Sequence, residues 1–147
     1  MGALSIPAAG SVYVDANCVI YSVEKHPIYW PLLEPVWQAA KGKTIEVVSS
    51  DLVLMETLIG PLKSGDSALA VSYEQLFLQP QTRRFPITHA ILREGARLRA
   101  TTKLKTPDAI HAATGLNIAC ALFVTNDIGF RSVPGLPLVI LDDLLKP

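Results

Sequence analysis

The sequence is poor in cysteine and in charge. Only 2 of its 147 residues are cysteine, and 18% are charged. Cys18 and Cys120 stand in apolar stretches without metal-site spacing, so buried free thiols in a reducing compartment are the better interpretation. Low charge together with 50% hydrophobic residues excludes an intrinsically disordered chain. We therefore expect a folded, cytoplasmic protein.

Long apolar runs and the familiar catalytic motifs are missing as well. No stretch approaches the ~20 apolar residues of a membrane-spanning helix, and residues 1–10 lack the basic leader of a secretory signal. No GxGxxG, GxxxxGKS/T, GxSxG, HExxH or CxxC occurs, which disfavours common nucleotide, acyl-transfer, zinc and redox sites. We expect residues 1–11 to be a flexible N-terminal segment and residues 12–147 to be one domain without membrane association.

Charge is balanced overall but unevenly distributed. The chain has 13 basic and 13 acidic residues, yet the only acid between residues 83 and 105 is Glu94. The same segment contains seven basic residues: Arg83, Arg84, Arg93, Arg97, Arg99, Lys103 and Lys105. Such a segment can follow a phosphate backbone, although a solvated helix face explains it too. Within it, Arg93 and Arg97 lie one helical turn apart and are candidate phosphate contacts.

Short apolar strands alternate with helical segments along the chain. The sequence pattern predicts strands at 12–14, 45–50, 82–87, 121–127 and 137–143. It predicts helices at 18–26, 28–41, 51–60, 66–78, 88–103 and 106–119. This alternation indicates a mostly parallel, three-layer α/β fold, in which ligands bind outside the carboxyl ends of the strands.

Two aspartates directly follow predicted strands. Asp15 follows the first strand, and Asp127 follows the fourth after Thr125 and Asn126. Both are expected at the same edge of the sheet. Taken singly, each is as well explained as the N-cap of the helix that follows.

Glu56 and Asp108 stand on helices. Glu56 falls in the stripe Leu52, Met55, Ile59, which has the spacing of a core-facing side, so its carboxylate needs a partner, either an arginine or a metal. Asp108 is in the first turn of its helix, where the helix dipole alone favours an acid.

The helix that carries Asp108 has small residues on the same face. That face continues through Ala112, Gly115 and Ala119, which would let the helix pack closely on the sheet. Four acids gathered at one edge would repel one another without a cation. Oxygen donors without clustered histidine or cysteine suit Mg²⁺ or Mn²⁺, which can polarise a phosphodiester and activate water.

Four segments resemble the acidic motifs of the PIN-domain nucleases, specifically the VapC-type toxins of bacterial and archaeal toxin–antitoxin pairs. In chain order they are VYVDANCVIY, DLVLMETLIGPL, TPDAIHAAT and LFVTNDIGF. The resemblance covers nearly the whole chain and implies a five-stranded parallel sheet in the order 3-2-1-4-5, flanked by helices. It also implies Mg²⁺- or Mn²⁺-dependent cleavage of RNA, a VapB-type antitoxin as partner, and a homodimer.

The resemblance further assigns roles to individual residues. Asp15, Asp108 and Asp127 would hold the metal, and Glu56 would orient or deprotonate the attacking water. These four would be the catalytic acids. Asn17 and Thr125 would be polar supports.

Two other functions remain open at this stage. Aspartate-dependent phosphatases also place an aspartate after their first strand, but here Asn17 replaces their second acid. A non-catalytic RNA-binding module on the same fold is the other alternative. An assay with a phosphomonoester and an RNA oligonucleotide, each with Mn²⁺, separates these functions. A phosphatase would hydrolyse the first, a nuclease the second, and a binding module neither.

Overall fold

The computed structural model describes residues 2–147 as a single parallel sheet covered by helices on both faces. The strands are β1 (Ser11–Val14), β2 (Glu46–Ser50), β3 (Thr82–Phe85), β4 (Leu122–Thr125) and β5 (Leu138–Ile140). Their order is β3-β2-β1-β4-β5, and every neighbouring pair is parallel. The expected fold class and strand order are confirmed.

The helices are α1 (Ala16–Val23), α2 (Trp30–Lys41), α3 (Leu52–Ser64), α4 (Ser67–Leu76), α5 (His89–Thr101), α6 (Thr106–Asn117), the 3₁₀ helix η1 (Ile128–Ser132) and α7 (Leu141–Leu144). The first six match predicted helices with modest shifts in their ends. The structure adds η1 and α7, and α7 replaces the end of the strand predicted at 137–143. The predicted end of α3 at residue 60 is wrong. The helix continues through Pro61 and stops at Gly65, whose positive φ of 72° makes it a left-handed C-cap.

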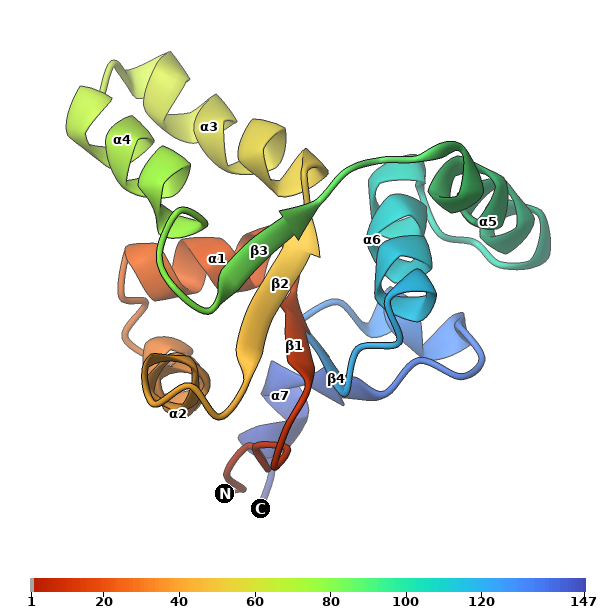
Figure 1. The fold of residues 1–147 in the computed structure, drawn as a ribbon, viewed down its shortest axis with the longest axis horizontal. Coiled ribbons are helices and arrows are strands. Elements are labelled where there is room, and N and C mark those ends of the chain that lie inside the picture. Colours follow the sequence, from red (N-terminus) through yellow and green to blue (C-terminus); the bar gives the residue numbers. More distant parts are fainter. Residues whose placement is uncertain (1) are drawn as a thin grey trace.

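Alternation along β1 divides the interior into two cores. Val12 and Val14 face one side of the sheet, where α1 and α2 contribute most of the apolar contacts. Tyr13 faces the other side, where α5, α6 and η1 pack. Figure 1 shows this layering, with α1 and α2 on one side of the strands and α6 on the other. Burial on both faces explains why β1 is continuously apolar from Val12 to Val14.

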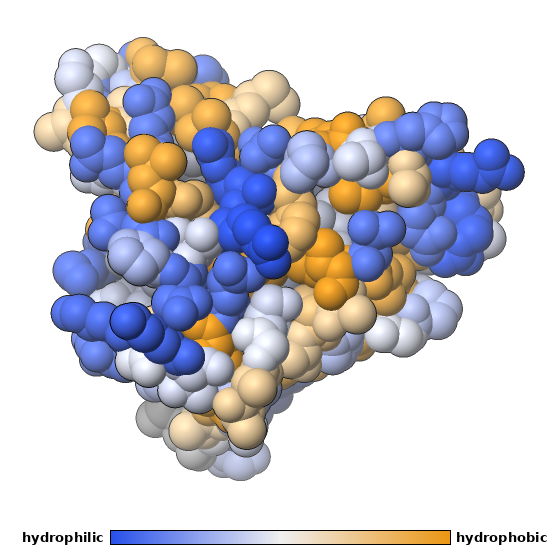
Figure 2. All heavy atoms as spheres, in the orientation of Figure 1, coloured by the Kyte–Doolittle hydropathy of each residue, from blue (hydrophilic) through white to orange (hydrophobic). Residues whose placement is uncertain are grey.

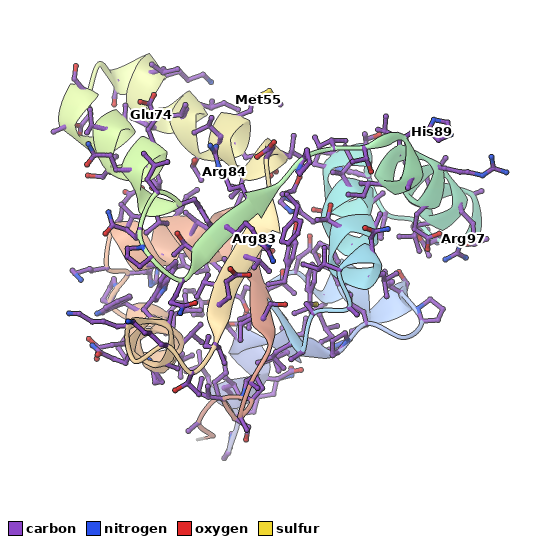
Figure 3. The ribbon with its side chains drawn as sticks, in the orientation of Figure 1. Met55, Glu74, Arg83, Arg84, His89 and Arg97 are labelled. Atoms are coloured by element: carbon purple, nitrogen blue, oxygen red, sulfur yellow. The ribbon has the colours of Figure 1, made fainter. Side chains whose placement is uncertain are left out.

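The buried face of α3 differs from the prediction. Val53, Thr57 and Pro61 are the buried residues of this helix, whereas Met55 is 62% and Ile59 49% exposed. The predicted core stripe is therefore wrong, because α3 packs against α1 and α4 through the residues at i, i+4 and i+8. Figure 3 shows Met55 pointing away from the body of the protein.

The buried face of α5 is narrow. Ile91 and Leu98 are buried, whereas Leu92 and Ala96 are exposed and Gly95 takes the central buried position. A Cβ at Gly95 would lie 3.7 Å from the carbonyl oxygen of Ala109. The contact between α5 and α6 is thus made through a glycine, which a search for apolar residues does not detect.

The N-terminal segment makes contacts with the body of the protein. Met1 lies outside the described residues. The amide of Gly2 donates to the carbonyl of Leu144 at 2.8 Å, and Leu4 is buried in the first core. Gly2 and Leu4 are therefore in contact with the rest of the domain. The flexibility expected for residues 1–11 and the domain boundary at residue 12 stay predictions.

Within residues 2–147, no helix has both the length and the apolar character needed to cross a membrane. The cytoplasmic location expected from the sequence stays a prediction.

Candidate acidic active site

Asp15 is a buried carboxylate at the junction of β1 and α1. Its Oδ1 accepts a hydrogen bond from the Cys18 amide at 3.1 Å, so it caps α1. Its Oδ2 accepts from the hydroxyl of Thr125, at the end of β4. Burial raises the pKa of Asp15, against the lowering effect of these hydrogen bonds.

Asp127 is linked to Asp15 through the same threonine. Its backbone amide donates to the Thr125 hydroxyl at 3.0 Å, and its Oδ1 accepts from the Gly129 amide at 2.8 Å, which caps η1. Both aspartates are therefore N-caps, as the simplest interpretation of the sequence holds. The same geometry brings them to one edge of the sheet, because β1 and β4 are adjacent and parallel.

Asp108 reaches this edge because α6 lies close to the sheet. Ala112 and Gly115 are buried, and a Cβ at Gly115 would lie only 2.8 Å from Cδ2 of Phe123 on β4. The predicted small-residue face thus allows the close approach, except that Ala119 lies beyond the helix and is exposed. Burial and the neighbouring Asp127 carboxylate raise the pKa of Asp108 to about 6.

Glu56 is held by a histidine rather than by an arginine. Its Oε1 lies 2.5 Å from Nε2 of His111, and its side chain is 24% exposed. Nδ1 of His111 lies 2.6 Å from the hydroxyl of the buried Tyr13. A chain of hydrogen bonds therefore runs from β1 through α6 to α3, with the half-buried Glu56 at its open end.

The four acids line one small cavity of about 70 Å³ at the carboxyl edge of the sheet. The complete lining is Asp15, Ala16, Asn17, Glu56, Asp108, His111 and Asp127. Asn17 is exposed in the first turn of α1 and adds a neutral oxygen to this set. Residues separated by more than a hundred positions in the sequence are thus neighbours.

The donor chemistry of this cavity fits a hard divalent cation. Asp127, Asp15 and Glu56 all raise the pKa of Asp108 by like-charge repulsion, which a bound cation would relieve. Across residues 2–147, no three His, Cys, Asp or Glu side chains stand ready-arranged around a metal position. Asp15, Glu56 and Asp127 each direct an oxygen to a protein partner, so holding an ion requires these side chains to turn toward the cavity.

His111 is the residue that sequence reasoning missed. A lone histidine one helical turn after Asp108 is typical of an ordinary packed side chain. The side chain of His111 is indeed packed, with 1% exposure. Its two ring nitrogens, however, form hydrogen bonds with Tyr13 and Glu56. The available signal was a single imidazole in a helix face that otherwise consists of small residues.

The two arginines predicted to contact RNA do not line this cavity. Arg97 forms an ion pair with Glu94 at 2.5 Å on the exposed side of α5. Figure 3 shows Arg97 on α5, with α6 between it and the strands. Arg93 is exposed on the same helix. Contact of either residue with RNA stays an untested prediction.

Fold and site together define a class of protein: a three-layer α/β domain with a carboxylate-lined cavity at the carboxyl edge of its sheet. The PIN domain model matches residues 12–136, and the chain belongs to the PIN domain family. No relative was found among curated proteins.

Three solved structures illustrate the shared fold. VapBC2 from Rickettsia felis, bound to a DNA fragment from its promoter, is 23% identical and covers 88% of this chain and 98% of its own, with a TM-score of 0.70. VapC20 from Mycobacterium tuberculosis, a sarcin–ricin loop cleaving toxin, is 16% identical over 86% and 97%, with a TM-score of 0.70. A toxin–antitoxin complex from Klebsiella pneumoniae is 20% identical over 88% and 97%, with a TM-score of 0.59.

Proposed function

We propose that this chain is a VapC-type toxin, an endoribonuclease that uses Mg²⁺ or Mn²⁺ to hydrolyse RNA phosphodiester bonds. The observation that carries the proposal is the convergence of Asp15, Glu56, Asp108 and Asp127 on one cavity. Membership of the PIN domain family supports it, as does the likeness in fold to a sarcin–ricin loop cleaving toxin. RNA as substrate and the identity of the cation are part of the proposal.

Asp15, Asp108 and Asp127 would hold the cation. When bound, it would neutralise charge on the phosphodiester and make water a better nucleophile at neutral pH. Asp15 is fixed by the Cys18 amide and Thr125, and Asp127 by the Gly129 amide. Both acids already line the cavity, so cation binding would require these side chains to turn and exchange partners, without movement of the strands that carry them.

Glu56 would orient the attacking water and accept its proton. Its position at the open end of the Tyr13–His111 chain leaves one carboxylate oxygen for this task, because the other is engaged by Nε2 of His111. The half-buried setting excludes bulk water from one side while the other side faces the cavity. His111 acts here as a positioning residue.

The test is cleavage of a labelled single-stranded RNA by the purified protein, with and without Mn²⁺. We expect cleavage only with the cation, and a loss of roughly 10²-fold or more in Asp15→Asn and Asp127→Asn. Asp66→Asn is the matched control, because Asp66 caps α4 on the surface and asparagine caps equally well. Wild-type rates in both site variants would overturn the proposal, and turnover of a phosphomonoester instead of RNA would favour the phosphatase alternative.

A VapB-type antitoxin is the proposed partner, since two of the similar structures contain toxin and antitoxin together. The homodimer expected from the sequence is proposed alongside it. Exposed apolar side chains on α3 and α4 offer contact surface: Met55, Ile59, Leu62 and Val71. Figure 2 shows hydrophobic surface over these two helices. Co-expression with the product of the reading frame next to this gene, followed by mass determination, tests both.

A further inference from the structure

A larger groove opens directly beside the acidic cavity. Its volume is about 900 Å³, within the range of ligand-binding sites. One wall is the connection between α5 and α6, the other is η1, and Asp108 and Asp127 stand in both the groove and the acidic cavity. The residues that line it are Thr102, Lys103, Leu104, Lys105, Asp108, Asp127, Ile128, Gly129, Arg131 and Ser132.

The first wall is held in place by its own hydrogen bonds. Leu104 is buried at 6% exposure and anchors the connection. Its carbonyl accepts from Nε of Arg99 at 3.2 Å, and its amide donates to the hydroxyl of Thr102 at 3.1 Å. With Leu104 turned inward, its neighbours Lys103 and Lys105 are exposed and both line the groove.

The second wall meets the first at Gly129. A Cβ there would lie 3.0 Å from Oδ1 of Asp127 and 3.8 Å from Cδ2 of Leu104. Glycine therefore lets η1 approach both the acid and the anchoring leucine. Leu104, Asp127 and Gly129 all line the groove.

Lys103 and Lys105 differ from three of the five arginines in their segment. Those three arginines are neutralised by acids: Arg83 by Glu46, Arg84 by Asp51 and Arg97 by Glu94. Neither lysine forms an ion pair within residues 2–147. In the opposite wall, Arg131 is paired with Asp143 at 2.6 Å. Two unpaired lysines therefore line a groove that shares two carboxylates with the acidic cavity.

We propose that this groove binds the phosphate backbone of the substrate strand beside the bond that is cut, with Lys103 and Lys105 as its phosphate contacts. The proposal rests on RNA cleavage at the acidic cavity. Because the groove and cavity share Asp108 and Asp127, a strand seated on the two lysines leads directly to the acids. An ammonium group contacts phosphate without reading bases, so the groove contributes affinity and register rather than sequence preference.

The experiment measures binding of a short fluorescein-labelled single-stranded RNA in EDTA, across a salt series, so that no cleavage occurs. Three proteins are compared: wild type, the lysine pair Lys103→Ala/Lys105→Ala, and the control pair Lys41→Ala/Lys43→Ala. The control pair removes two exposed lysines at the same spacing from the segment before β2, outside the groove. We expect the lysine pair alone to lower the slope of log K against log salt by about 1.4, corresponding to two phosphate contacts on a single strand. We also expect Lys103→Arg/Lys105→Arg to retain the wild-type slope.

Two outcomes overturn the groove: an unchanged slope in the lysine pair, or an equal loss in the control pair, which would show a diffuse charge effect. Thermal unfolding of each variant checks that the connection between α5 and α6 still folds. A Mn²⁺-dependent cleavage assay separates this proposal from the proposed function. If the lysine pair alone loses RNA binding but the wild type does not cleave RNA, the groove is supported and the nuclease function is contradicted. If the wild type cleaves RNA and the lysine pair binds RNA as the wild type does, the nuclease function is supported and the groove is contradicted.

Discussion

At the scale of single residues, Thr125 organises the candidate site. Its hydroxyl donates to Asp15 and accepts from the amide of Asp127. One buried side chain therefore fixes the spacing of two acids that would otherwise repel each other. The same principle applies to His111, which connects Tyr13 with Glu56. Neutral hydrogen-bonding residues thus set the geometry of charged ones.

Removing the imidazole of His111 tests whether it positions Glu56. We expect His111→Ala to lower kcat by about 10–100-fold with little change in KM, because supporting hydrogen bonds at catalytic sites have effects of this size. Tyr13→Phe is the comparison, since it leaves the contact between His111 and Glu56 in place and should lose much less activity. A folded His111→Ala protein with normal kcat would show that the histidine serves only packing.

Cation binding is expected to depend on pH through Asp108. Its pKa is raised from 3.8 to about 6 by burial and by Asp127, so between these values the folded protein holds a proton that the unfolded chain has lost. The cation-free protein therefore loses stability as pH rises from about 4 to about 6, and Mn²⁺ affinity increases over the same range. Thermal unfolding with and without Mn²⁺ measures both trends. Affinity that is flat across this window would contradict the shift.

At the scale of elements, the position of α6 decides whether Asp108 and His111 reach the site. Gly115 lies against Phe123, whose ring is stacked on Tyr13 at 4.7 Å and touches Phe130 at 5.0 Å between centroids. A ring enclosed on both sides has little room to move. The distance between α6 and the sheet is therefore set by Gly115, which has no side chain to separate the helix from Phe123.

Adding a methyl group at Gly115 should separate α6 from the sheet. We expect Gly115→Ala to destabilise the protein by roughly 1–3 kcal/mol through overpacking and to reduce cleavage by displacing Asp108. Gly60→Ala is the matched control: no atom lies within 4 Å of its would-be Cβ, and alanine should stabilise α3 by about 0.5–1 kcal/mol. Chemical denaturation of both variants gives the two values. Equal effects would contradict close packing at Gly115.

The parallel α/β fold and the gathering of acids could be predicted from the local pattern, whereas the strand order came from the resemblance to the PIN-domain nucleases. Apolar strands ending at Asp15 and Asp127 already indicate a shared sheet edge. The buried side of α3 could not be predicted, because its apolar residues surround the helix and tertiary packing selects Val53 over Met55. The partner of Glu56 was equally hidden, since His111 is far away in sequence and near only in the fold.

At the scale of the whole molecule, the three layers bring β1, α3, α6 and β4 together at one edge of the sheet. The apolar cores on both faces fix the strands, and the helices then hold their acids above the strand ends. Charged side chains of both signs lie at this edge, because the exposed lysines of the groove adjoin the acids of the cavity. Substrate contact and chemistry would therefore occur on adjoining surfaces.

The account depends on the four acids acting as one cation site, and calorimetric titration with Mn²⁺ tests this most directly. Wild-type protein should release or absorb heat with saturable binding, and Asp15→Asn and Asp127→Asn should each weaken that binding by at least ~10-fold. Asp66→Asn should bind as the wild type does. Binding that is absent from the wild type, or that survives unchanged in both site variants, would contradict the account.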